Sequence, residues 1–164
     1  MEQKDIEYII RAHDLFPVKP SKAFRKHDGK TPSYTHSLWC ATTILAETNL
    51  DESLRNKGGL ILLYHDLLED TTLPLPDWLP NDIIRGINDM TFESFTKETK
   101  LIFRKNKEIR LFKLYDKVNN LMDSSWMSIE KKLAYNRYTE ILYQEVSTNF
   151  PKLNITKFAK SILC

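Results

Sequence analysis

The chain is organised around one stretch, Tyr64-His65-Asp66-Leu67-Leu68-Glu69-Asp70-Thr71, which directly follows the apolar run Leu60-Ile61-Leu62-Leu63. Four groups that can bind a metal or transfer a proton fall within six residues of this stretch. In a continuous helix, Glu69 would share one face with His65 and Asp66. Burying an imidazole and carboxylates together costs several kcal/mol unless a cation or hydrogen bonds compensate. The stretch therefore predicts a divalent metal whose remaining ligands come from elsewhere in the chain.

Length and composition indicate a single domain with an ordinary core. The chain has 164 residues, of which 41% are hydrophobic and 28% are charged, as in typical globular proteins. A net charge of +2 provides no broad attraction to nucleic acid or to a membrane surface. No stretch approaches the roughly 18 uninterrupted apolar residues of a transmembrane helix, and the charged N-terminus leads into no signal peptide. Cys40 and Cys164 could form one disulfide, but we favour two free thiols in a reducing cytoplasm.

Helical spacing of apolar residues dominates the chain, and no convincing alternating strand occurs. Gly58 and Gly59 cost the helix that begins after Asp51 about 1 kcal/mol each relative to alanine, which is tolerable if another helix approaches closely there. This helix delivers the opening stretch. The other predicted helices cover residues 4–15, 34–48, 81–89, 104–121, 129–147 and 151–163, with Pro151 in the first turn of the last. The chain is therefore predicted to be all-α.

Three segments carry no clear helical pattern. Residues 19–33 are predicted to form a basic loop, which is either a solvated connection or a contact for substrate phosphates. Residues 71–80 contain three prolines and are predicted to be a loop. Residues 91–100 are ambiguous, and we treat them as a flexible segment.

Separate helices supply the candidate metal ligands. His36 lies in the first turn of the helix at 34–48, and Asp116 lies in the helix at 104–121. With His65 and Asp66 they offer two imidazoles and two carboxylates, a set that suits Mn, Fe, Co, Ni or Zn and is too rich in nitrogen for Ca or Mg. Each residue also has a structural alternative, because either histidine could simply be hydrogen-bonded in the interior and Asp116 could pair with a neighbouring lysine.

These four residues resemble the H…HD…D signature of the HD metal-dependent phosphohydrolase superfamily. The longer string from His65 to Thr71 is similar to the HDxxEDT motif of the RelA/SpoT hydrolase domain and of the small alarmone hydrolases, including the metazoan SpoT homologues. Two further blocks agree in order. Arg25-Lys26, followed by Gly29, Pro32, Tyr34 and His36, resembles an RKxxGxPYxxH segment, and Lys113 to Leu121 resembles a KLADRLHN-like segment.

The resemblance runs from about residue 20 to 145 and implies one HD-type helical bundle over residues 1–164, with the metal site between helices. It implies that one metal, Mn²⁺ or another divalent transition metal, is bound by His36, His65, Asp66 and Asp116. Glu69 and Asp70 would be catalytic, because they would orient a water molecule and take its proton during attack on phosphorus.

The resemblance also assigns three residues to the substrate. Arg25 would lie over a guanine base, Lys26 would lie near phosphate, and Asn120 would hold the substrate or support the site. An arginine suits the first role because its guanidinium plane both stacks and donates hydrogen bonds.

The implied reaction is metal-dependent hydrolysis of the 3′-pyrophosphate of guanosine tetra- or pentaphosphate ((p)ppGpp), which leaves GDP or GTP. The alternatives are an HD-type nucleotidase or pyrophosphohydrolase of another nucleotide and a non-catalytic nucleotide sensor. The pair Glu69-Asp70 argues against the sensor, because pure binding has no evident need for both carboxylates. The expected partner is a small nucleotide, with no nucleic acid and no membrane, and we leave a homodimer open.

Overall fold

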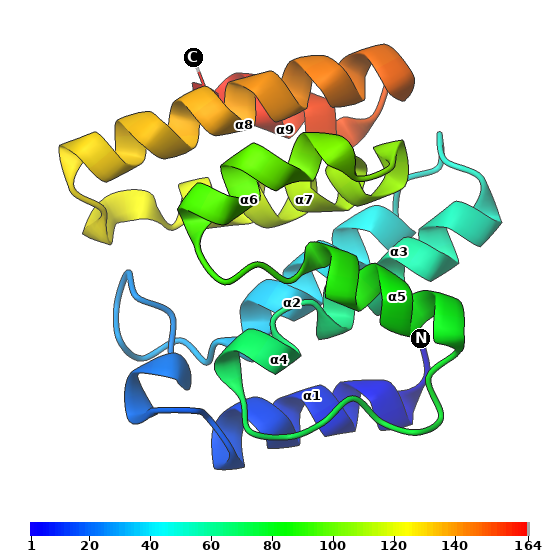
Figure 1. Cartoon of the computed structure of the whole chain (residues 1–164), viewed down its shortest axis with the longest axis vertical. Helices are drawn as coiled ribbons and strands as arrows, with labels where there is room; N and C mark the ends of the chain where they lie inside the picture. The colour runs from blue at the N-terminus through cyan, green and yellow to red at the C-terminus, as the bar shows by residue number, and fades with distance from the viewer. Residues whose placement is uncertain (164) are drawn as a thin grey trace.

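Helices make up nearly all of the regular structure in the computed structural model, which describes residues 1–163 (Figure 1). The α-helices are α1 (Gln3–Leu15), α2 (Tyr34–Leu45), α3 (Glu52–Tyr64), α4 (Leu67–Asp70), α5 (Asn81–Met90), α6 (Phe95–Leu101), α7 (Lys107–Met122), α8 (Ile129–Asn149) and α9 (Asn154–Leu163). Short 3-10 turns are η1 (Pro20–Lys22), η2 (Ile102–Arg104) and η3 (Ser124–Trp126). Within residues 1–163 the β-pairing is confined to two isolated bridges. The all-α prediction is therefore confirmed.

The central helix is α7, in which every residue from Leu111 to Asn119 is buried. It contacts α2, α3 and α5 on one side and α8 and α9 on the other, while α1 lies at the far end of the molecule from α8 and α9 (Figure 1). The predicted buried stripe of this helix is confirmed, and it consists of Leu111, Leu114, Val118 and Leu121. A helix that is covered on all sides carries its polar residues, including Asp116, into the interior.

Gly58 allows three helices to meet closely. A β-carbon added to Gly58 would lie 2.5 Å from Cδ1 of Ile44 on α2 and 2.6 Å from Cε1 of Phe112 on α7. Glycine is therefore required for α2 and α7 to pack this closely against α3. The predicted close approach is confirmed, and it brings together the helices that carry the candidate ligands.

The opening stretch is not one continuous helix, so the shared face that a continuous helix would give to Glu69, His65 and Asp66 does not form in that way. α3 ends at Tyr64, and α4 begins at Leu67. Nδ1 of His65 lies 2.7 Å from the carbonyl oxygen of Leu62, which in an uninterrupted helix would accept from the backbone N–H of Asp66. The histidine side chain thus takes a backbone acceptor, and the chain turns between the two helices.

Two further predictions are corrected. Residues 91–100 contain an ordered helix, α6, whose N-terminus is capped by Ser94 Oγ accepting from the backbone N–H of Lys97 at 3.2 Å. The last helix begins at Asn154, so Pro151 precedes it. Lys152 has a φ of 69°, which is incompatible with a helix that starts at Pro151.

The start of α9 is set by a residue far away in the sequence. The buried carboxylate of Glu47 accepts from the backbone N–H groups of Asn154 at 2.6 Å and Ile155 at 3.4 Å. A carboxylate at this position satisfies N–H groups that have no partner within the helix.

The loop that follows α1 is tied to the end of α4. The backbone N–H of Val18 donates to the carbonyl oxygen of Asp70 at 2.9 Å, and that of Thr72 donates to Phe16 at 2.8 Å. These bonds hold the basic loop at residues 19–33 next to the acidic residues of the opening stretch.

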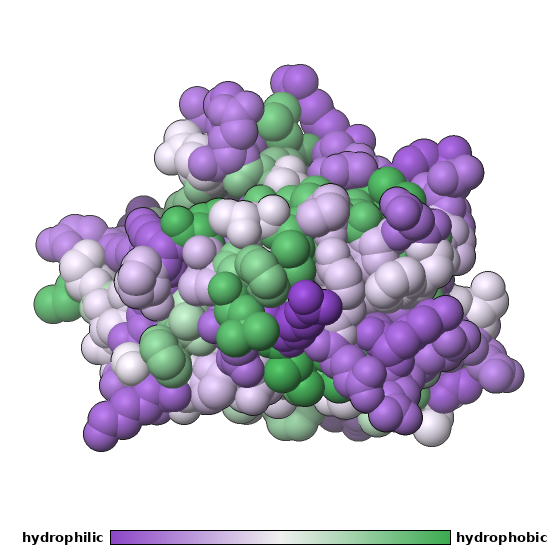
Figure 2. All heavy atoms as spheres, turned by 90° about the horizontal axis from the view of Figure 1, so that it is seen from below, coloured by the Kyte–Doolittle hydropathy of each residue, from purple (hydrophilic) through white to green (hydrophobic). Residues whose placement is uncertain are grey.

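The exterior adds little to the functional argument. Seen from the α1 side, apolar side chains gather near the middle of the surface with hydrophilic ones around them (Figure 2).

No helix within residues 1–163 is long and apolar enough to cross a membrane. Cys40 is fully buried and forms no disulfide with the residues described, whereas Cys164 lies outside them.

Candidate metal centre

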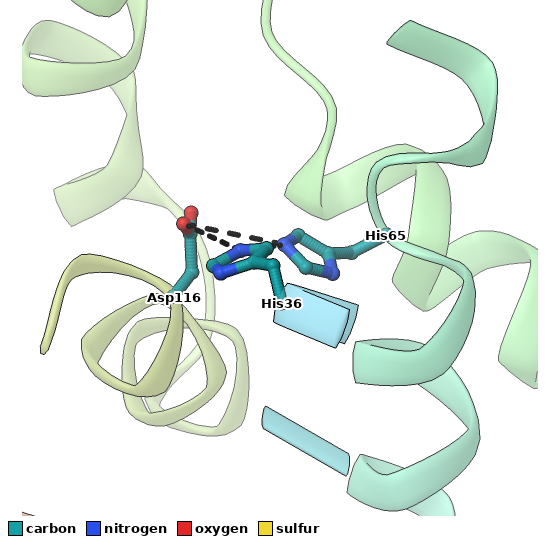
Figure 3. Close-up of side chains that lie close together, drawn as sticks. All are labelled: His36, His65 and Asp116. Atoms are coloured by element: carbon teal, nitrogen blue, oxygen red, sulfur yellow. Dashed lines mark hydrogen bonds and ion pairs between the residues drawn. The ribbon is translucent and has the colours of Figure 1, made fainter. Parts of the chain in front are cut away.

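Two imidazoles face each other in the interior. His36 lies in the first turn of α2, His65 directly follows α3, and both are almost fully buried. Their Nε2 atoms are 3.2 Å apart. Oδ1 of Asp116 lies 3.4 Å from Nε2 of His36 and 4.0 Å from Nε2 of His65. Figure 3 shows the three side chains converging on one point from separate parts of the chain.

The hydrogen bonds of the rings leave both Nε2 lone pairs directed at this point. Nδ1 of His65 lies 2.7 Å from the Leu62 carbonyl, which can only accept, so Nδ1 carries the ring proton. Nδ1 of His36 lies 2.5 Å from Oδ1 of Asn119, another acceptor, so it carries its proton in the same way. Burial lowers the pKa of His65, which keeps this ring neutral. Two lone pairs this close repel each other unless a metal ion or a shared proton lies between them.

Two of the three donor separations fit neighbouring ligands of one divalent transition-metal ion, whereas His65 Nε2 and Asp116 Oδ1, 4.0 Å apart, are too far apart to be neighbouring ligands at the same bond length. Ligands bound about 2.1 Å from one ion lie about 3.0–3.4 Å apart in octahedral or tetrahedral geometry. The Nε2–Nε2 separation of 3.2 Å and the His36 Nε2 to Asp116 Oδ1 separation of 3.4 Å fall in this range. Within residues 1–163, the donor atoms of His36, His65 and Asp116 all lie within 4.8 Å of one another. The set suits a metal that accepts both nitrogen and oxygen.

Asp66, the fourth predicted ligand, contacts the same imidazoles from the pocket. Its Oδ1 lies 3.2 Å from Nε2 of His65 and its Oδ2 lies 3.5 Å from Nε2 of His36. Burial would raise the pKa of Asp66, but the two histidines outweigh it and lower that pKa. Asp66 is not part of the mutually close set of three. The structure nevertheless brings all four predicted ligands together, and their role as ligands stays a prediction.

The two oxygens of Asp116 have different surroundings. Oδ1 faces the imidazoles, whereas Oδ2 forms ion pairs with the ammonium groups of Lys113 at 3.1 Å and Lys117 at 3.2 Å. Both lysines also contact Glu98 of α6, at 3.6 Å and 2.9 Å. Burial would raise the pKa of Asp116, but Lys117 and Lys113 hold it well below its usual range. The carboxylate is therefore ionised, and it both pairs with lysine and lies in the ligand position.

Glu69 and Asp70 lie in α4 and line a pocket beside the candidate ligands. Glu69 accepts from the backbone N–H of Phe92 at 3.1 Å, and Asp70 forms an ion pair with Lys22. Desolvation and the charge of Asp66 raise the pKa of Glu69 to about 7. The same two causes raise the pKa of Asp70 to about 6, although Lys22 opposes them. Glu69 can therefore exchange a proton near neutral pH.

The pocket has a volume of about 260 Å³ and joins the acidic centre to a basic rim. Lys26 and Lys131 line it, and their Nζ atoms lie 4.5 Å and 4.3 Å from the ring centre of Trp126. Desolvation and the charge of Lys131 lower the pKa of Lys26. Two ammonium groups close to one ring are attractive to a phosphate or another anion.

Arg25, in the basic loop, contacts the C-terminal part of α7, which carries Asn120. The guanidinium of Arg25 donates to Asp123 at 3.1 Å and to the side-chain oxygens of Asn119 and Asn120 at 3.3 Å each. Asn120 in turn donates through Nδ2 to Oδ1 of Asp116 at 2.5 Å. Both residues also line the pocket. In this structure they support the candidate ligands, and a contact with substrate stays a prediction.

Several residues of the site gave no usable signal in the sequence. Their contacts join distant segments, as in the pairs Lys22–Asp70, 48 residues apart, and His36–Asn119, 83 residues apart. The lysines beside Asp116 are an exception, because their helical spacing suggested the pairing. The residues that were missed are Lys22, Glu98, Asn119, Asp123, Trp126 and Lys131.

Comparison with known proteins identifies the fold. No protein-family model matches the chain, and no curated protein sequence matches it. A solved structure described as a metazoan ortholog of SpoT, which hydrolyses ppGpp and plays a role in starvation responses, is similar with a TM-score of 0.76 and 17% sequence identity. The likeness covers 97% of this chain and 91% of that one. The predicted SpoT-like, HD-type helical fold is therefore confirmed.

Proposed function

We propose that the chain is a metal-dependent phosphohydrolase that removes the 3′-pyrophosphate of a (p)ppGpp-like nucleotide and leaves GDP or GTP. The observation that carries the proposal is the pair of imidazole Nε2 atoms, 3.2 Å apart, with Asp116 beside them and a pocket lined by carboxylates next to them. A second support is the fold shared with a ppGpp hydrolase.

His36, His65, Asp66 and Asp116 would hold the metal, with Mn²⁺ as the first candidate and another divalent transition metal as the alternative. When bound, the ion would lower the pKa of a water molecule and draw charge from the phosphoryl oxygens. The protein's own contribution is the orientation of the ligands. Each ring donates its Nδ1 proton to a fixed oxygen, which keeps Nε2 free.

Glu69 is the residue best placed to accept the proton of the attacking water. In the metal-free protein its pKa is about 7, and a bound cation would lower this pKa, so Glu69 would be ionised and able to accept a proton at neutral pH. Asp70 is held in place by Lys22, so we assign it to orienting the water. On the rim, Lys26 and Lys131 would bind phosphate oxygens, with Trp126 beside them.

One observation favours a second candidate, hydrolysis of a different nucleotide. The guanidinium of Arg25 already donates to three side chains of the α7 end, so in this conformation it is engaged away from a base. Recognition of guanine by stacking on Arg25 would require these bonds to change. Another base, or another part of the pocket, is compatible with the structure as it stands.

The decisive experiment is a turnover assay with Mn²⁺ on guanosine tetraphosphate beside a panel of mono- and dinucleotides. We expect release of pyrophosphate and GDP from the tetraphosphate. Turnover on the panel alone would replace this substrate with the second candidate. Binding without any turnover would favour a nucleotide sensor.

The variant Glu69→Ala tests the catalytic assignment. We expect turnover to fall by about 10²–10⁴-fold with nucleotide binding retained, since general-base catalysis contributes this much. Glu7→Ala, which removes an exposed carboxylate of α1 outside the pocket, is the matched control and should match wild type. Equal turnover in Glu69→Ala and wild type would contradict the proposed base.

A further inference from the structure

A single guanidinium contacts both asparagines that hold candidate metal ligands. The Arg25 side chain is 13% exposed and is held by Asp123, whose Oδ2 lies 3.2 Å from Nε and 3.1 Å from Nη2. The same Nη2 lies 3.3 Å from Oδ1 of Asn119 and 3.3 Å from Oδ1 of Asn120. Arginine has donors and no acceptor, so every atom that it contacts in this way must be an acceptor, which in an asparagine side chain is the oxygen.

This requirement fixes which way each amide faces. An asparagine amide can turn its oxygen or its NH₂ toward a neighbour, and the hydrogen-bond partners decide between the two. With both oxygens drawn to Arg25, Asn119 also presents Oδ1 to Nδ1 of His36 at 2.5 Å. Asn120 presents its NH₂ to Oδ1 of Asp116 at 2.5 Å.

The orientation of Asn119 selects the tautomer of His36. Because Oδ1 can only accept, Nδ1 of His36 carries the proton, and in a neutral ring this leaves Nε2 free to bind a metal. If the amide turned, its NH₂ would donate to Nδ1, and the proton of a neutral ring would move to Nε2. A protonated Nε2 cannot be a ligand.

The orientation of Asn120 acts on Asp116 in the same direction. Its NH₂ stabilises the ionised carboxylate, whereas the amide oxygen at this distance would repel it. We infer that Arg25 is a positioning residue that, through Asn119 and Asn120, orients His36 and Asp116 for metal binding. The inference rests on the proposed metal site and adds a function for an arginine that the family resemblance assigns to substrate.

The first readout uses the metal-free protein. Nitrogen-15 NMR of the imidazoles distinguishes a ring protonated on Nδ1 from one protonated on Nε2. We expect wild type to show His36 protonated on Nδ1 and Arg25→Met to show loss of this single tautomer. An unchanged tautomer in Arg25→Met would overturn the inference, whether or not the protein binds metal.

The second readout is Mn²⁺ affinity measured by calorimetry without nucleotide. We expect Arg25→Met to bind Mn²⁺ about 10–100-fold more weakly than wild type, the usual effect of removing a residue that orients a ligand. Lys30→Met removes an exposed charge from the same loop and is the matched control. If Arg25→Met binds Mn²⁺ as wild type does and raises only the KM of the nucleotide, Arg25 acts on substrate and the inference fails.

A rescue variant separates positioning from a general loss of structure. Asn119→Asp offers His36 an oxygen in either orientation, so it no longer needs Arg25 to choose between oxygen and NH₂. The double variant Arg25→Met with Asn119→Asp should therefore recover the Nδ1-protonated tautomer of His36. Failure of this rescue in a protein that remains folded by circular dichroism would overturn the proposed route through Asn119. Absence of Mn²⁺ binding in wild type would sink the proposed function, while the tautomer measurements would still decide the positioning role.

Discussion

The two oxygens of Asp116 face two groups of charge that are balanced in different ways. Around Oδ2, the lysine cluster consists of Lys113, Lys117 and Glu98. The two ammonium groups are balanced by two carboxylates, those of Glu98 and of Asp116 itself. Around Oδ1, the pocket cluster consists of His36, His65, Asp66, Glu69 and Asp70. Its two imidazoles direct lone pairs at each other, and Lys22 pairs with only one of its three carboxylates.

This difference shows two uses of buried charge: balanced ion pairs stabilise the fold, whereas an unbalanced cluster can bind a cation. In the lysine cluster, the charges are paired with one another, so the cluster requires no bound ion. The pocket cluster has more negative than positive charge, and its imidazole nitrogens have lone pairs that can bind a metal. Burying this arrangement is favourable only when a cation is bound. The following tests act on one cluster at a time.

Metal removal should have the largest effect, because it leaves the pocket cluster without its cation. Treatment with a chelator should abolish nucleotide hydrolysis, and adding Mn²⁺ should restore it. At 100 times the dissociation constant, Mn²⁺ should also raise the free energy of unfolding by about 2.7 kcal/mol. Hydrolysis rates and urea unfolding measure the two effects. Full activity after chelation would refute the metal-dependent reaction.

Loss of one charged side chain should lower the free energy of unfolding more in the lysine cluster than in the pocket cluster. Lys117→Met leaves an excess buried carboxylate, so we expect unfolding free energy to fall by about 3–5 kcal/mol in urea denaturation. Lys132→Met, on the exposed face of α8, should change it by no more than about 0.5 kcal/mol.

A compensating variant checks the reason for this loss. Glu98→Gln combined with Lys117→Met restores the balance of charge, so the double variant should be less destabilised than the sum of the single ones. Strict additivity would mean that these two side chains are not coupled.

The smallest expected effect is the contribution of Glu69 and Asp70 of the pocket cluster to the pH dependence of stability. The folded-state pKa values of Glu69 and Asp70, about 7 and about 6, exceed their ordinary values of 4.5 and 3.8. At Glu69 and Asp70 the folded protein binds more protons than the unfolded chain between these values, so their contribution to stability falls as pH rises toward 7. The lowered pKa values of His13 and His65 act in the opposite direction below about 6.5, so the comparison with a variant isolates the effect of Glu69. In urea unfolding of the metal-free protein, the free energy of unfolding of wild type relative to Glu69→Gln should be lower at pH 7.5 than at pH 5. The same difference at both pH values would show that Glu69 does not contribute to the pH dependence.

Much of the helical fold was predictable from the sequence because the evidence was local. The helices at 4–15, 34–48, 81–89, 104–121 and 129–147 all occur, with ends within three residues of their predicted bounds. The errors arose where a distant or side-chain partner decided the outcome. The Nδ1 of His65 interrupts α3, and the carboxylate of Glu47 helps to set the start of α9.

The candidate site likewise contains residues that the local sequence indicated and residues whose role depends on distant contacts. The sequence placed the H…HD…D residues on different helices, and the structure brings their side chains together, while their roles as ligands stay predictions. The sequence contained no sign that Arg25 would turn toward α7, or that Glu98 would complete a charge cluster from a segment treated as flexible.

Local sequence thus accounts for most of the helices, the apolar stripe of α7 and the residue types that meet at the site. These follow from periodicity and from the chemistry of each side chain, which act over a few residues. The tertiary structure alone decided which lone pairs face each other, which oxygen of Asp116 meets lysine, and which way two amides point. Those choices depend on hydrogen-bond partners up to 98 residues apart, and they exist only after the helices have packed.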